Sequence, residues 1–127
     1  MSGNIQRFPA ESGGALSSDV TVIGNTAYTT VIPVDADGEL VEGITAQSEA
    51  VIDALVTDLG KVGAGLGDIA HLTIYLCDIA NTRAAFNEVY ARRFGDVVPV
   101  RCAVGVAALA RPTMLVELTA IAAVPTR

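Results

Sequence analysis

Two charged residues interrupt otherwise apolar runs in the last third of the chain. Arg101 lies in the run VRCAV, and Glu117 lies in the run LVELT. Charged side chains are rarely buried unless they are paired, so each of these residues requires an explanation. One interpretation is structural: the side chains are exposed, or they pair with each other across neighbouring strands. The other is chemical: a pocket in which a guanidinium binds a carboxylate and a carboxylate acts as a general base.

The remaining candidates for chemistry are weaker. His71 is the only histidine and lies within a strand-like run, which favours a half-exposed sheet residue over a catalytic pair. Cys77 and Cys102 form no Cys-x-x-Cys motif, so we expect two free thiols in a reducing compartment. One histidine and two cysteines fall short of a zinc ligand set, and we expect neither a metal nor a cofactor.

The glycine-rich segment 60–67 (GKVGAGLG) resembles a phosphate-binding loop only superficially. Such a loop follows a strand and opens a helix, whose N-terminus holds the phosphate. Here the segment follows a helical pattern and precedes a strand pattern. We therefore interpret it as a helix stop followed by a connector.

Composition narrows the classes of function. The net charge is −6, and Lys61 is the only lysine among eight basic residues that are scattered along the chain. Nucleic-acid binding requires clustered basic residues, so it is not expected. Only 17% of the 127 residues are charged while 51% are hydrophobic. A chain this short has too few charged residues to cover its surface, so we expect part of that surface to be buried in an oligomer.

A membrane location is not expected either. The longest apolar run is the nine residues 102–110, far short of the ~20 needed to span a bilayer. The first residues, MSGN, show no charged-then-apolar signal pattern. We expect a cytoplasmic protein.

Hydrophobic periodicity places these residues on elements of one domain, residues 1–127, in which 1–16 form a loosely ordered lead-in. We expect a helix of about 15 residues capped by Thr45 and a second helix over 82–94. The predicted strands are 20–23, 26–32, a short 39–41, 69–77, 100–106 and 114–123. The predicted class is α+β: a mixed sheet with two helices on one face. Its other face needs cover that this chain does not supply.

Three segments resemble the C-terminal half of the Rid family (YjgF-type, reactive-intermediate or imine deaminases). They are 86–90 (FNEVY), 99–104 (PVRCAV) and 116–122 (VELTAIA), in the family's order and at similar spacing. Segments 33–35 (PVD) and 38–41 (GELV) are similar to its N-terminal hairpin region. The resemblance covers about residues 17–123.

The resemblance implies a chorismate-mutase-like homotrimer whose sheets face inward, with sites at the subunit interfaces. It implies hydrolysis of reactive enamines or imines to 2-keto acids and ammonia. By position, Arg101 would bind the substrate carboxylate and Glu117 would position or activate water. Asn87 and Cys102 would line the pocket.

The N-terminal part of the implied pocket departs from the family pattern. Ser17 stands where a tyrosine is typical, and Thr30 stands where a glycine lets the backbone approach the ligand. We expect these two residues to alter which imino acid is accepted. Two alternatives remain: a non-catalytic trimer that binds small carboxylates, and an endoribonuclease, which the acidic charge disfavours.

Overall fold

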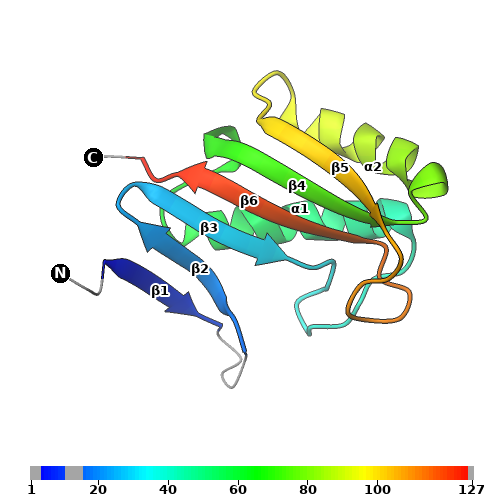
Figure 1. Ribbon diagram of the computed structural model, residues 1–127, viewed down its shortest axis with the longest axis horizontal. Coiled ribbons are helices and arrows are strands. Elements are labelled where there is room, and N and C mark those ends of the chain that lie inside the picture. Colours follow the sequence, from blue (N-terminus) through cyan, green and yellow to red (C-terminus); the bar gives the residue numbers. More distant parts are fainter. Residues whose placement is uncertain (1–3, 11–15, 126–127) are drawn as a thin grey trace.

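The computed structural model describes residues 4–10 and 16–125. In this part of the chain, six strands form one mixed sheet, and two long helices cover one of its faces (Figure 1). The elements are β1 (Ile5–Pro9), β2 (Ser18–Ile23), β3 (Thr26–Val31), α1 (Ile44–Gly60), a 3₁₀ turn (Leu66–Asp68), β4 (Ile69–Cys77), α2 (Ile79–Phe94), β5 (Val100–Val106) and β6 (Val116–Ala123). The predicted α+β class is confirmed.

The strand order is β1-β2-β3-β6-β4-β5. Neighbours run antiparallel except β4 and β5, which are parallel and connected through α2. The last strand in sequence is thus inserted in the middle of the sheet, and β5 forms one edge (Figure 1). None of the helices in the described ranges combines the length and the hydrophobicity needed to cross a bilayer.

The core lies between the sheet and the two helices. On β4, Leu72, Ile74 and Leu76 are fully buried against the helices, while the alternate residues are partly exposed on the open face. This is the period of two that places successive strand side chains on opposite faces. The apolar stripes of both helices are buried: Val51, Leu55 and Leu59 on α1, and Phe86, Val89, Tyr90 and Phe94 on α2.

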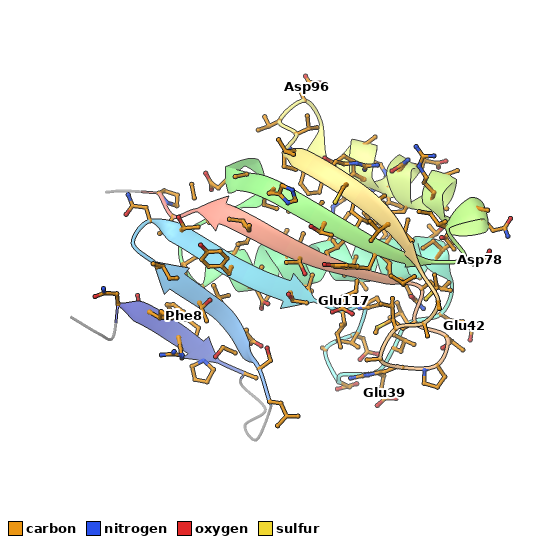
Figure 2. All side chains as sticks on the ribbon, in the orientation of Figure 1. Phe8, Glu39, Glu42, Asp78, Asp96 and Glu117 are labelled. Carbon is orange, nitrogen blue, oxygen red and sulfur yellow. The ribbon has the colours of Figure 1, made fainter. Side chains whose placement is uncertain are left out.

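The predicted lead-in was wrong for Ile5–Pro9, which form the edge strand β1 and pair antiparallel with β2. Phe8 lies opposite Val20 and packs on the small cluster formed by Val20, Val22 and Ala27. Backbone pairing with β2 and this apolar contact hold the segment on the sheet, and Figure 2 labels Phe8 on β1. The predicted strand 39–41 is reduced to a single bridge between Val34 and Leu40.

Both helices begin earlier than predicted. Helix α1 follows Gly43, whose φ of 87° suits glycine, and Thr45 makes no cap. Helix α2 begins at Ile79 after Asp78, which has left-handed φ 51° and stands at the turn after β4 (Figure 2). The Thr82 hydroxyl donates back to Cys77 O at 2.9 Å, so it lies inside the first turn and does not cap it.

A single amide side chain, Gln47 of α1, ties together three segments. Its Nε2 donates to Val41 O at 3.0 Å and to Thr113 O at 2.9 Å, and its Oε1 accepts from Leu115 N at 2.7 Å. Gln47 is 1% exposed. These bonds hold Thr113 and Leu115 just before β6. Leu115 had been predicted to belong to that strand, which begins only at Val116.

A polar cluster joins the β2–β3 hairpin to the end of α1. Lys61 Nζ lies 2.6 Å from Asp19 Oδ2 and 3.5 Å from Asp58 Oδ1, and the Thr29 hydroxyl lies 3.0 Å from Asp58 Oδ2. Burial is the largest influence on Asp58 and raises the pKa of its carboxyl group, outweighing the opposing hydrogen bond from Thr29. The cluster fixes the hairpin that carries Thr30.

Candidate active site

Arg101 lies on the helix-facing side of the edge strand β5. Its register partner on β4 is Leu72, a core residue, so both side chains lie on the same side of the sheet. Arg101 Nη2 donates to Asn87 Oδ1 at 2.6 Å, and the guanidinium carbon lies 4.5 Å from the centroid of the Tyr90 ring. Asn87 and Tyr90 are three residues apart on α2, which places them on one helix face. The helix therefore orients the guanidinium from two sides.

The Arg101 guanidinium borders an open hollow between β5 and α2. The hollow has a volume of about 440 Å³ and is lined by Ile79, Ala80, Arg83, Arg101 and Ala103. In the described ranges Arg101 has no carboxylate partner; the neutral Asn87 amide only orients it. Such a site suits a ligand carboxylate, which a guanidinium binds through two parallel hydrogen bonds.

Close packing of β5 on α2 defines one end of this hollow. A Cβ atom placed on Gly105 would lie 2.8 Å from Ile79 Cγ2. Only glycine allows the strand to approach the first turn of α2 so closely. Gly105 therefore helps to set the distance between Ile79 and the strand that carries Arg101.

Glu117 lies near the start of β6 (Figure 2), on the open face of the sheet. Its register partner on β4 is Tyr75, whose side chain alternates with the buried Ile74 and Leu76. Within the described part of the chain its carboxylate makes no hydrogen bond or ion pair. Burial raises the pKa of Glu117. A partly desolvated carboxylate with a raised pKa is a stronger base than an exposed one.

Ser17 and Thr30, the two site residues predicted from the N-terminal part of the chain, line a second hollow on the open face of the sheet, where Glu117 lies. Thr119 lines it with them, and its volume is about 230 Å³. Thr30 Oγ1 lies 3.1 Å from Thr119 Oγ1, one position along the same face from Glu117. Ser17, Thr30 and Glu117 thus belong to one half of the candidate site, and Arg101 with Asn87 belongs to the other.

Cys102 does not line the Arg101 hollow within a single chain, and its predicted place in a pocket between two copies stays a prediction. It follows Arg101 directly, so its side chain points to the open face, where Thr73 is its register partner. Ala103 occupies the wall position instead. The two cysteines are free, as expected. His71 lies partly exposed on the same open face of β4.

Arg83 and the orienting role of Tyr90 were not predicted from the sequence. Tyr90 belongs to the apolar stripe of α2, and its distance of three residues from Asn87 already put both on one face. Arg83 precedes Asn87 by four residues, a spacing that already indicated a shared side of the helix. The glycine-rich segment is a connector, as predicted: α1 ends at Gly60 and Gly63 adopts φ 77°.

Comparison with known proteins places these features in context. The family model described as Endoribonuclease L-PSP matches residues 9–124. A RutC family protein of Pyrococcus abyssi is 39% identical over 108 residues, which cover 83% of this chain and 84% of that protein. The RutC family protein YoaB of Escherichia coli is 39% identical over 121 residues, covering 94% and 98%. A solved YjgF/YER057c/UK114 family member from Mycobacterium tuberculosis has a TM-score of 0.81 at 30% identity and covers 94% and 99%.

Proposed function

Because the chain belongs to the Endoribonuclease L-PSP family, together with its RutC- and YjgF-type relatives, we propose that it hydrolyses reactive 2-imino and enamine acids to 2-oxo acids and ammonia. The observation that carries this proposal is the Arg101 guanidinium. It is oriented by Asn87 and Tyr90, borders an open hollow and has no carboxylate partner in the described ranges. A small organic acid supplies the missing charge.

In this proposal Arg101 binds the carboxylate next to the imine carbon and fixes that carbon relative to a water molecule. Positioning of this kind contributes much to reactions that already proceed in water. Asn87 and the Tyr90 ring hold the guanidinium plane, so little side-chain freedom is lost when the ligand binds. The hydrogen bond from Arg101 to Asn87 supports this role.

Glu117 acts as the general base. Its carboxylate takes a proton from water while the water oxygen forms a bond to the imine carbon and the C=N π electrons move to nitrogen. Glu117 then returns the proton to nitrogen, which gives a carbinolamine. Glu117 next moves the hydroxyl proton to the amino nitrogen, the C–N bond breaks, and ammonia leaves as the carbonyl group forms. The overall reaction is imine plus water to 2-oxo acid plus ammonia. The raised pKa of Glu117 supports its role in carrying this proton.

The proposal requires a second copy of the chain. Arg101 and Glu117 lie on opposite faces of one sheet, so a single copy cannot present both to one substrate. A neighbour whose open face meets the β5–α2 edge can bring its own Glu117, Thr30 and Ser17 toward Arg101. We propose a homotrimer with such a site between each pair of neighbours, in which closed symmetry repeats one interface three times. The two free cysteines support a reducing, cytoplasmic location.

The test is the decay of 2-imino acids generated in place by an amino-acid oxidase, with ammonia and 2-oxo acid measured against the spontaneous rate. Acceleration by the wild-type chain and its loss in Glu117→Gln are expected. A wild-type chain that binds 2-oxo acids yet accelerates no imine hydrolysis would instead establish a carboxylate-binding trimer. Thr30 favours the carboxylate-binding candidate. Its hydroxyl is hydrogen-bonded to that of Thr119, one position along the open face from Glu117.

The family description also names an endoribonuclease activity. The net charge of −6 disfavours tracking of a phosphate backbone, and the chain has a single lysine. Salt-dependent binding of single-stranded RNA, with cleavage followed on the same substrate, separates this weaker alternative from the hydrolase.

A further inference from the structure

Arg83 is a basic residue that the proposed reaction does not use. It lies on α2 four residues before Asn87, so the two residues share one side of the helix. Arg83 borders the 440 Å³ hollow together with Arg101. It also borders an adjoining hollow of about 250 Å³ together with Asn87. The position of Arg83 thus connects it to both residues of the proposed carboxylate site.

All the charged side chains that line the 440 Å³ hollow are positive. Its lining includes two guanidinium groups, Arg83 and Arg101, and no acidic side chain. Within 4–10 and 16–125, neither guanidinium makes an ion pair. The other end of α2 differs: Arg93 lies 2.8 Å from both Glu49 and Asp53, and Arg92 also pairs with Glu49. Helix α2 therefore neutralises its C-terminal arginines within the fold and leaves Arg83 available to a ligand.

The remaining lining matches a short hydrocarbon segment. Ile79, Ala80 and Ala103 supply apolar walls, and the volume lies toward the lower end of the range for small-molecule sites. The first turn of α2, which contains Ile79 and Ala80, adds the positive end of the helix dipole. A ligand with two anionic ends joined by a few carbon atoms satisfies both guanidinium groups and the apolar walls.

We propose that Arg83 binds a second carboxylate, so that the substrate is a short dicarboxylic 2-imino acid. This rests on the proposed function, in which Arg101 binds the carboxylate next to the imine carbon. Arg83 is then a specificity-determining residue that contacts the far end of the substrate. It takes no part in the attack of water, for which Glu117 is responsible.

The test compares two unreactive five-carbon acids, 2-oxoglutarate and 2-oxopentanoate, which differ in the terminal carboxylate. Their affinities are measured by titration calorimetry for the wild type, Arg83→Gln and the charge-matched control Arg92→Gln. We expect the wild type to prefer 2-oxoglutarate by roughly tenfold or more, the usual effect of a charge-assisted hydrogen bond. Arg83→Gln should remove this preference and leave 2-oxopentanoate binding unchanged. Arg92→Gln should retain the preference.

Equal wild-type affinities for the two acids overturn the role of Arg83, even if imines are hydrolysed. Equal loss in Arg83→Gln and Arg92→Gln also overturns it, because that result reflects net charge alone. A preference that depends on Arg83 without imine hydrolysis supports the dicarboxylate site and contradicts the proposed catalysis. The two proposals can therefore fail separately. Because Arg83 is exposed on α2, its substitution is not expected to alter the melting temperature.

Discussion

Arg101 and Glu117 lie on opposite faces of the same sheet, with only β4 between their strands. Arg101 is in register with the buried Leu72, and Glu117 is in register with Tyr75 on the open face. The two charges therefore do not pair within the chain, which excludes one of the structural explanations considered for them. A shared site requires residues from two copies.

Arg101→Lys is expected to weaken binding of 2-oxo acids by roughly tenfold while the fold is retained. Lysine keeps the charge but cannot form two parallel hydrogen bonds to a carboxylate or stack its head group on the Tyr90 ring in the same way. Titration calorimetry with 2-oxopentanoate measures the loss, and circular dichroism checks the fold. Wild-type affinity in the variant would show that Arg101 is structural.

Glu117→Gln should retain 2-oxo acid binding but reduce the rate of imine hydrolysis by about 10²- to 10⁴-fold, the usual contribution of a general base. Glutamine keeps the shape of the side chain and cannot take the proton. In the wild type the carboxylate must be ionised, so the rate should fall as the pH drops through the raised pKa of Glu117. A rate that is unchanged across that range argues for a different base.

Mixing two inactive variants should restore activity if each site combines two copies. Arg101→Ala and Glu117→Gln each disable every site in a pure trimer. In a random equal mixture obtained by refolding together, roughly a quarter of the sites combine an intact Arg101 with an intact Glu117 from a neighbour. The hydrolysis rate should recover to about that share. No recovery, in a mixture shown by light scattering to be trimeric, contradicts the shared site.

Asp58→Asn tests the polar cluster behind the β2–β3 hairpin. Burial raises the pKa of Asp58 in the folded state, so the folded chain binds this proton more tightly than the unfolded chain. The associated stability is present at acidic pH and is lost as the pH rises through the folded-state pKa. The free energy of unfolding of Asp58→Asn, relative to wild type, should therefore increase from pH 4 to pH 7 in urea titrations. A difference independent of pH would show that Lys61 and Thr29 offset the burial.

Much of the architecture could be predicted from local patterns. Apolar runs located β4 and β5 to the residue, and the apolar stripe of α2 identified its buried face. The start of α2 was missed because no side chain caps it. The residue before the helix, Asp78, has a left-handed conformation instead. The strand β1 was missed because its pairing with β2 depends on contacts beyond the segment itself.

Only part of the candidate site was predicted from the sequence: Arg83 and the role of Tyr90 were missed, and the arrangement of the residues was not predicted. Arg101 and Asn87 were both identified, and they are 2.6 Å apart. The alternation of strand side chains already indicated that Cys102 points away from Arg101. The faces of Arg101 and Glu117 depend on how β5 and β6 align with β4, which is a long-range property of the sheet.

The amide of Gln47 has a consequence for how this chain can diverge. Because it fixes Thr113 O and Leu115 N just ahead of β6, it anchors the strand independently of the loop that precedes it. Insertions or deletions between β5 and that anchor can be absorbed in the loop without sliding β6. A slip of one residue would turn Glu117 toward the helices. The length of this loop can therefore vary in evolution, while the Glu117 carboxylate keeps its orientation.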